Sequence, residues 1–360
     1  MGRLHSSETT PRPAVATAQK RLHGLTGLRF FAAAWVFAYH FAVLTVDGAP
    51  WWVQRAQNAG HAAVSLFFVL SGFVLAYNYA APLGDRRVTR ARFFWLRLAR
   101  VWPLYALVAI VEIPLAIAAG TAPGRMGAAT AADLIGLQAW IPSITFLGNT
   151  PGWSVSVELF FYAAFPWLAL VAAHPRYARA ALAGGLVLAL GCAATPALVS
   201  PASGSATFLK CGPLLRLPEF VVGIALGRAF LSRRRTLAPA AANALAAIGT
   251  LAVVAIVLAS GHVPRYFLHA LLLPAFALLL WAVASGGARP LGSPALRLLG
   301  EASYGLYLLQ MPLFQALAGK YEWSLVRMVG FFALLVALSI AVHFTVEKPA
   351  QRWLVARAPR

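Results

Sequence analysis

The feature that most constrains this chain is an apolar stretch, residues 24–44, that carries two ionisable side chains. It is long enough to cross a bilayer as one helix, which takes ~20 apolar residues. Arg29 and His40 lie eleven positions apart, so both side chains leave the same helical face, about 16 Å from one another. Ionisable groups inside a membrane span are costly and usually functional. We therefore expect this face to line a cavity; the alternative is an arginine that reaches the lipid headgroups and a histidine satisfied within the core.

Similar apolar stretches recur along the chain and decide its fold class. Hydrophobic residues make up 60% of the sequence and charged residues only 11%, against about 25% charged residues in soluble domains. The composition predicts an all-α, polytopic transmembrane helical bundle of about ten spans, embedded as a multi-pass protein in the lipid bilayer of the cell membrane. The spans are expected at residues 24–45, 61–81, 96–119, 153–172, 177–193, 214–231, 241–260, 265–284, 297–317 and 325–346.

The basic residues fall in alternate connecting segments. Of the 30 lysines and arginines, 22 lie in segments that would share one side with both termini, and this bias predicts that both termini are cytoplasmic. Topology thus accounts for the net charge of +20 without a nucleic-acid partner. Residues 1–22 and 354–360 are expected to be cytoplasmic tails, the first of them disordered, around one transmembrane domain at 23–353. The sequence has no metal-site pattern and gives no indication of the oligomeric state.

The most basic connecting segment holds two arginines that topology alone does not require. Arg97 and Arg100 are three residues apart and so share a helix face at the cytoplasmic end of the third span. Planar guanidinium groups suit phosphate oxygens. A phosphate-binding surface is one interpretation, and a solvated topology signal that contacts anionic lipid is the other.

A carboxylate and a serine lie inside neighbouring spans. Counted from the span edges, Glu158 reaches nearly the depth of His40, so we expect the two to meet, with the carboxylate orienting the imidazole as a general base. Ser71 lies near the middle of the second span, where a small residue serves close helix packing or a hydrogen bond across the interface. Packing alone explains Ser71 as well as any function does.

Other polar residues leave alternatives open. Arg216 and Glu219 share a face of the sixth span, either as a self-satisfied ion pair or as part of a site. Cys192 and Cys211 are compatible with a disulfide and equally with two free thiols. A polar stripe runs along the ninth span, and the sequence Glu347-Lys348-Pro349 is expected to end the last helix. The stripe consists of Glu301, Tyr304, Tyr307 and Gln310.

An ordered set of motifs resembles the membrane-bound acyltransferase-3 family over residues 24–353. The motifs are Arg29 with His40, FFVLSGF at 67–73, Arg97 with Arg100, WSVSVELFFY at 153–162, ASYGLYLLQMPL at 302–313, and Glu347-Lys348-Pro349. The resemblance implies ten core spans and transfer of an acyl group, commonly acetyl, from cytoplasmic acyl-CoA to a hydroxyl. Acceptors in the family include surface polysaccharides, peptidoglycan and macrolide sugars.

The same resemblance implies roles for individual residues. His40 would be catalytic, with Arg29 as its partner on the helix, and Glu158 would be the motif acid. Arg97 and Arg100, with Arg29 and Ser71, would lie along the path of the coenzyme. The chain departs from the family pattern at two positions: Gln310 stands where many relatives have a histidine, and Ser65 stands where an acid is common.

The sequence thus predicts an acyl-CoA-dependent O-acyltransferase whose acceptor is a carbohydrate or a glycosylated small molecule. Acyl-CoA, most simply acetyl-CoA, is expected as a co-substrate and not as a permanently bound cofactor. Direct transfer with His40 as base and transfer through an acyl-histidine both remain open. A multi-span transporter or flippase without acyl-transfer chemistry is the alternative, because buried charges along a transmembrane path also occur there.

Overall fold

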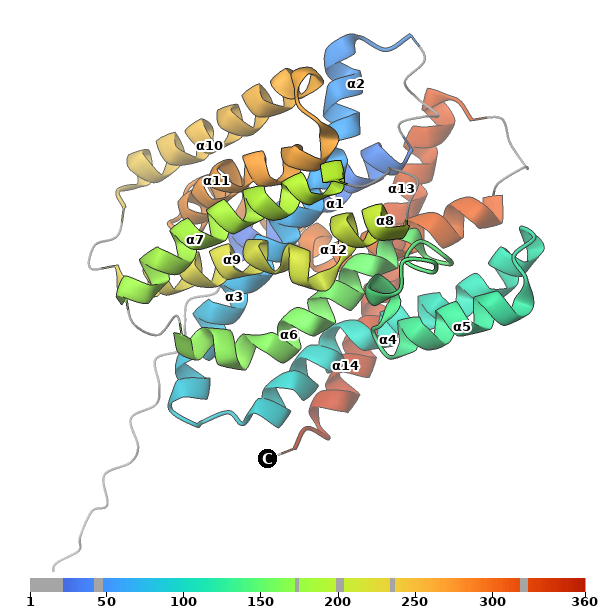
Figure 1. Cartoon of the computed structure of the whole chain (residues 1–360), viewed down its shortest axis with the longest axis horizontal. Coiled ribbons are helices and arrows are strands. Elements are labelled where there is room, and N and C mark those ends of the chain that lie inside the picture. The colour runs from blue at the N-terminus through green and yellow to red at the C-terminus, as the bar shows by residue number, and fades with distance from the viewer. Residues whose placement is uncertain are drawn as a thin grey trace, which may run out of the picture.

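The computed structural model describes residues 22–41, 48–171, 175–198, 204–233, 237–317 and 323–359, which form helices and connecting turns without a strand. The first predicted tail lies, except for its last residue, outside this described part of the chain. The α-helices (Figure 1) are α1 (His23–His40), α2 (Trp51–Asn58), α3 (Ala63–Gly84), α4 (Arg90–Ala118), α5 (Pro123–Leu134), α6 (Trp153–Val171), α7 (Pro175–Ala194), α8 (Gly204–Cys211), α9 (Pro213–Ser232), α10 (Pro239–Ala259), α11 (Arg265–Ala284), α12 (Pro294–Leu317), α13 (Leu325–Val342) and α14 (Lys348–Val355).

Each of the ten predicted spans falls on a helix. Within the described residues, seven helical segments are long and apolar enough to cross a membrane. The three predicted spans outside this set lie on α1, α9 and α12, whose sequences carry ionisable side chains such as Arg29, Glu219 and Glu301. The all-helical fold is therefore confirmed, with seven candidate membrane spans among the described residues. The number of spans and the sides of the termini remain predictions.

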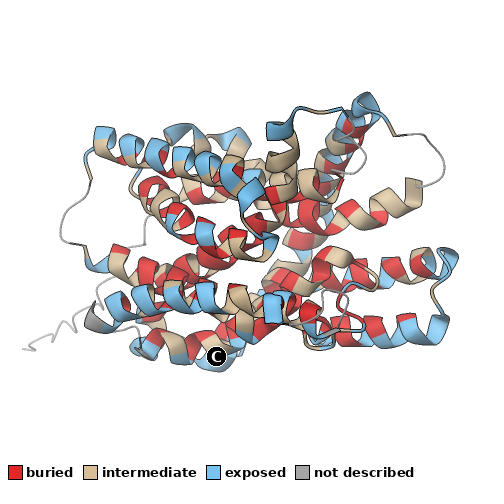
Figure 2. Cartoon of the chain, turned by 45° about the horizontal axis from the view of Figure 1, so that its top comes forward, coloured by how far each residue is buried: buried red, intermediate tan, exposed pale blue. Residues whose placement is uncertain are grey.

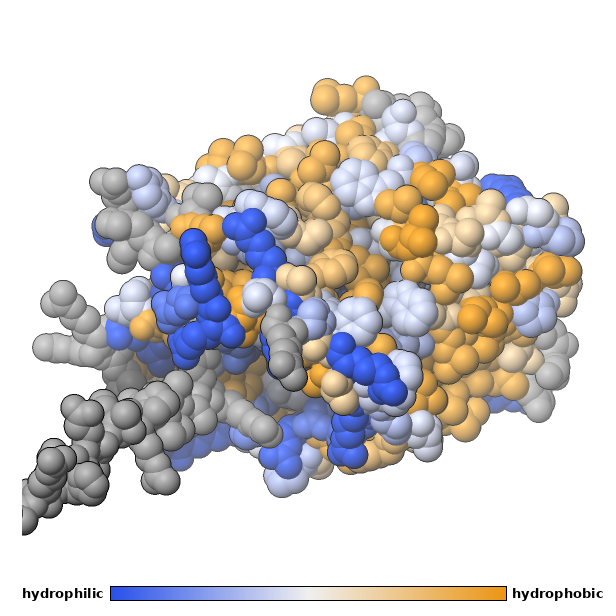
Figure 3. Space-filling model, turned by 90° about the horizontal axis from the view of Figure 1, so that it is seen from below, coloured by the Kyte–Doolittle hydropathy of each residue, from blue (hydrophilic) through white to orange (hydrophobic). Residues whose placement is uncertain are grey.

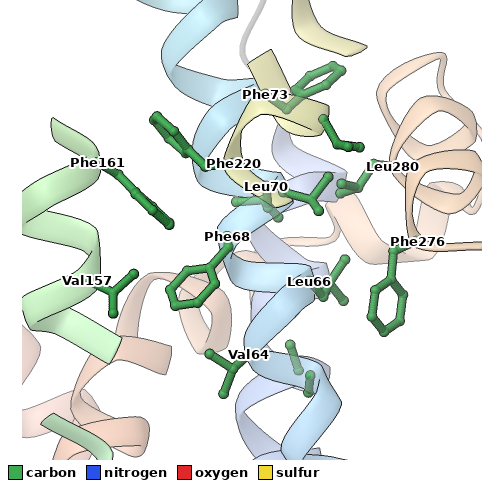
Figure 4. Close-up of a cluster of buried hydrophobic side chains, with 14 of the residues drawn as sticks. Val64, Leu66, Phe68, Leu70, Phe73, Val157, Phe161, Phe220, Phe276 and Leu280 are labelled. Atoms are coloured by element: carbon green, nitrogen blue, oxygen red, sulfur yellow. The ribbon is translucent and has the colours of Figure 1, made fainter. Parts of the chain in front are cut away.

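Helix α3 forms the centre of the bundle. Its most apolar window is 83% buried, and its side chains meet those of the helices around it, α6, α9 and α11 (Figure 4). Phe68 packs edge-on against Phe161, which stacks on Phe220. Gly72 on α3 and Gly223 on α9 allow the two helix backbones to touch. A Cβ on either residue would overlap the backbone of the opposite helix. This close packing fixes the position of the helix that carries Ser71.

The periphery of the bundle is apolar and exposed. The most apolar windows of α7 and α10 are only 22% and 17% buried, and large side chains such as Val187 and Leu251 face outward. Figure 2 shows the exposed faces on the outer helices around a buried interior. On the face shown in Figure 3, hydrophilic residues gather toward one end and a broad apolar surface covers much of the rest. An apolar belt with a polar edge is the surface expected of a protein in lipid.

Three short helices lie where the sequence indicated only loops. Helices α2, α5 and α8 fall in three of the segments that connect the predicted spans. They have 8, 12 and 8 residues, too few to span a bilayer. Their sequences lack the continuous apolar runs by which the spans were identified.

The end of the last span also differs from the prediction. The Glu347-Lys348-Pro349 sequence does not terminate the helix: a π-helical turn, His343–Glu347, leads directly into α14. Pro349 lies in the first turn of α14, the part of a helix that tolerates proline best. Helix α14 packs against the start of α4: Trp95 Nε1 donates to the Leu354 carbonyl at 2.7 Å and Arg92 Nη1 to the Pro359 carbonyl at 2.9 Å.

Candidate active site

A narrow cavity of about 100 Å³, here called the arginine chamber, lies between α1, α3, α4, α6 and α12. The predicted coenzyme residues meet in it from three helices: Arg29 on α1, Ser71 on α3, and both Arg97 and Arg100 on α4. Glu158 on α6 faces the same space. The five residues are therefore brought together, although they are spread over 130 positions of the sequence.

Glu158 accepts hydrogen bonds from two other residues of this chamber. Its Oε1 accepts hydrogen bonds from Ser71 Oγ at 2.9 Å and from Tyr162 Oη at 2.5 Å. The Arg29 guanidinium lies within electrostatic range of this carboxylate, and its Nε atom is buried without a hydrogen-bond partner among the described residues. A buried cation with unused donor capacity is suited to an anionic or carbonyl ligand.

The other two arginines are held by the first half of α4. The helix begins at Arg90, capped by Thr89, whose Oγ1 accepts from the Arg92 N–H at 3.1 Å. Arg97 Nη2 donates to Tyr79 Oη at 2.9 Å, and Arg100 Nη1 lies 3.9 Å from Glu347 Oε2. Glu347 projects from the end of the π-helical turn, so the C-terminal motif supports the arginine chamber.

A second cavity of about 460 Å³, here called the histidine chamber, adjoins the first. His40, His61 and His269 line it. Its other walls are aromatic and basic, with Tyr39, Phe146, Trp153 and Tyr266 beside Lys210, Arg216 and Arg265. Cys211 lies in the wall as a free thiol, and Cys192 is also unpaired, so the structure contains no disulfide between them.

The structure separates Glu158 from His40, in contrast to the sequence-based expectation. Glu158 lines the arginine chamber and His40 the histidine chamber. The expectation assumed straight helices perpendicular to the membrane, so that depth could be counted from the span edges. The helices in Figure 1 are inclined to one another, and equal counts along them do not give equal depths.

The acid beside the histidine chamber is Glu219. Its Oε1 lies 3.7 Å from His269 Nε2 and its Oε2 lies 3.0 Å from Arg216 Nη2. Arg216 Nη2 also donates to Ser65 Oγ at 2.9 Å. The predicted Arg216–Glu219 ion pair is thus present, and it is part of a larger network in the chamber wall.

The two chambers share a wall. Val64 and Tyr307 line both cavities. Tyr307 Oη lies 2.7 Å from Ser154 Oγ and donates to the Pro151 carbonyl at 3.1 Å, which holds the ring at the boundary. Arg29 and His40, predicted to share one helical face, therefore open onto two spaces that meet at Tyr307.

Several residues of this arrangement were not assigned by sequence reasoning. Tyr307 was visible only as part of a polar stripe, and His269 was not singled out. Ser154 carried no signal beyond its motif. Which helix each of them faces depends on tertiary packing, and a single sequence does not encode that in a readable form.

A separate pair of buried acids lies outside both chambers. Glu112 on α4 and Asp133 on α5 are almost completely buried and close to each other. Burial, with Glu112 nearby, raises the pKa of Asp133 to about 8. These acids are neither lining residues of the chambers nor part of the proposed chemistry.

Comparison with known proteins identifies a family and several relatives. The model of the acyltransferase domain family, type 3, matches residues 22–346. Acyltransferase MdmB of Streptomyces mycarofaciens is 30% identical, over 94% of each chain. The putative peptidoglycan O-acetyltransferase YrhL of Bacillus subtilis is 26% identical over 91% of this chain and 54% of its own. ExoZ of Rhizobium meliloti, an exopolysaccharide production protein, is 31% identical over 71% of this chain and 78% of its own.

No solved structure matches the chain. The family match covers nearly the whole described bundle, and it contains every helix that contributes a residue to the two chambers. The chain belongs to the acyltransferase-3 family of membrane acyltransferases.

Proposed function

We propose that this protein transfers a short acyl group, most simply acetyl, from acyl-CoA to a hydroxyl of a sugar in a surface glycan or a glycosylated metabolite. The observation that carries the proposal is the pair of adjoining chambers with Val64 and Tyr307 in their common wall. One chamber is rich in arginine and the other in histidine and aromatic rings. The arrangement suits two substrates of different chemistry that meet at one point.

The arginine chamber has the properties of a donor site. At about 100 Å³ it is smaller than whole-ligand pockets, which occupy roughly 300–1,000 Å³. It therefore suits the thin pantetheine arm and a short acyl group, with the nucleotide phosphates outside, on the face that carries Arg97 and Arg100. The polar edge of the protein would accordingly face the cytoplasm, where acyl-CoA is made.

The histidine chamber has the properties of an acceptor site. Its volume of about 460 Å³ suits a sugar unit, and Trp153, Tyr39 and Tyr266 offer aromatic faces on which a sugar ring can stack. The names of the relatives support this class: one is a putative peptidoglycan O-acetyltransferase and another an exopolysaccharide production protein.

In the proposed reaction, His40 removes the proton of the acceptor hydroxyl as its oxygen attacks the thioester carbonyl. The new C–O bond forms and the C–S bond breaks, and the departing coenzyme sulfur takes the proton back from the imidazolium to leave as free CoA thiol. The boundary at Tyr307 is where the two reacting atoms would meet. Arg29 and the other chamber arginines bind and orient the donor.

The donor assignment predicts a binding defect when its arginines are removed. Arg97→Ala with Arg100→Ala is expected to raise the KM for acetyl-CoA by at least about tenfold with a smaller change in kcat, because hydrogen bonds to charged groups contribute about 1.5–3 kcal/mol each. The measurement is release of CoA thiol by purified protein, with mass spectrometry of glycans and secreted metabolites used to identify the acceptor.

The matched control is Arg86→Ala with Arg87→Ala, two exposed arginines before the same helix that line neither chamber. This variant loses the same charge and should keep the wild-type KM. An unchanged KM in the Arg97/Arg100 variant would contradict the donor site. Absence of acyl transfer with every acyl-CoA and acceptor mixture would contradict the proposed function and favour transport.

A further inference from the structure

Gln310 is buried beside His40. Gln310 is on α12 and is completely buried. Helices α1 and α12 are in contact, and the Gln310 side chain is close enough to interact with the His40 imidazole. Two buried atoms at this contact lack a hydrogen-bond partner among the described residues: His40 Nδ1 and Gln310 Oε1. The two atoms are therefore not bonded to each other as they stand. Because unpaired polar atoms are costly to bury, a small side-chain rotation that joins these two complementary atoms would satisfy both.

A hydrogen bond within α12 settles the orientation of the Gln310 amide. Gln310 Nε2 donates to the Tyr307 carbonyl at 2.7 Å. Only the NH₂ end of an amide can donate to a carbonyl, and the reversed amide would place two oxygens against each other. The Tyr307 carbonyl therefore fixes Oε1 as the end of the side chain that is free for the histidine.

We propose that Gln310 is the positioning residue of His40: its Oε1 accepts the Nδ1–H and so leaves Nε2 as the unprotonated nitrogen that faces the acceptor. An oxygen acceptor behind Nδ1 selects one tautomer and one ring orientation, as the third group of a catalytic triad does. This inference rests on the proposed function, in which His40 is the base. It also explains how His40 is oriented although Glu158 lies in the other chamber.

An amide has a different effect from a carboxylate in this position. The neutral amide oxygen orients the ring, whereas a carboxylate would orient the ring and also stabilise the protonated imidazole. The distinction gives a measurable signature. The other histidines of the chamber, His61 and His269, and the basic residues Lys210, Arg216 and Arg265 are identical in all variants, so a change in pH dependence would report on His40.

Two substitutions test the proposal. Gln310→Met keeps the length of the side chain but removes the acceptor, and kcat should fall by at least about tenfold, with the KM for acetyl-CoA unchanged. Gln310→Glu restores a hydrogen-bond acceptor for Nδ1–H, so activity at high pH should recover. Because the carboxylate also stabilises the protonated imidazole, the pH below which activity is lost should move upward. The control is Gln315→Met, the same change on the same helix outside both chambers.

The outcomes separate this inference from the function on which it rests. If wild-type protein is active and His40→Ala is not, a Gln310→Met variant with normal kcat and an unchanged pH profile overturns the role of Gln310 alone. In a His40→Ala background, Gln310→Met should have no further effect on residual activity. If Gln310→Met does not fold, the pH profile of Gln310→Glu decides, and an unshifted profile overturns the proposal.

Discussion

Replacement of His40 by alanine is expected to reduce acyl transfer at least about 100-fold, because a positioned general base contributes roughly 10²–10⁴-fold to such reactions. His40 is the last residue of the helix that also carries Arg29, and it lines the larger of the two chambers. The loss should appear in kcat, since the arginines proposed to bind the donor are untouched. The measurement is CoA release and product formation with acetyl-CoA and the acceptor.

The matched control for this variant is His262→Ala. His262 is exposed in the turn between α10 and α11 and lines neither chamber. It should keep wild-type activity, and both variants should keep the elution profile and thermal stability of the wild type in detergent. Undiminished acylation by a well-folded His40→Ala protein would remove the basis of the proposed mechanism.

Replacement of Gly223 by alanine is expected to cost the protein most of its folded yield. A methyl group at this position would overlap the Val69 carbonyl oxygen, and Gly72 lies against the same contact from the other side. Overpacking typically costs 1–3 kcal/mol, and a clash with backbone, which cannot rotate away, is expected to reach about 3 kcal/mol or more. The α3–α9 contact would open, and Ser71 would move with α3.

The loss of stability is measured by heating the detergent-solubilised protein to a series of temperatures. Size-exclusion chromatography then gives the fraction that is still folded. Gly184→Ala on α7 is the matched control, because among the described residues no atom beyond the adjoining helix backbone lies within 4 Å of the added methyl group. Alanine also favours a helix relative to glycine by about 1 kcal/mol, so the control should be unchanged or slightly more stable. Equal stability of the two variants would show that α3 and α9 do not pack as closely as described.

The sequence predicted the positions of the membrane-length helices better than the contacts between them. Apolar runs are readable because each span needs the same length of hydrocarbon-compatible sequence, and all ten runs lie on helices. The inward face of Arg29 and His40 was also readable, because helical periodicity is local. The short helices α2, α5 and α8 were missed because they lack such runs.

Contacts between helices were not readable in the same way. Glu158 was paired with His40 by counting residues from span edges, and the structure instead gives it Ser71 and Tyr162. Gln310 stood out in the sequence as a departure from the family pattern, yet its neighbour became evident only in three dimensions. Tilt, kinks at prolines such as Pro166, and the choice of neighbour are tertiary properties that residue spacing does not specify.

The attachment of α14 to the start of α4 has a practical consequence for handling this protein. The carbonyls of Leu354 and Pro359 hold Trp95 and Arg92, less than two turns before Arg97. An affinity tag fused directly after Arg360 is expected to strain these two hydrogen bonds and so disturb the arginines of α4 that line the arginine chamber. A long flexible spacer ahead of such a tag should preserve turnover that a short fusion loses.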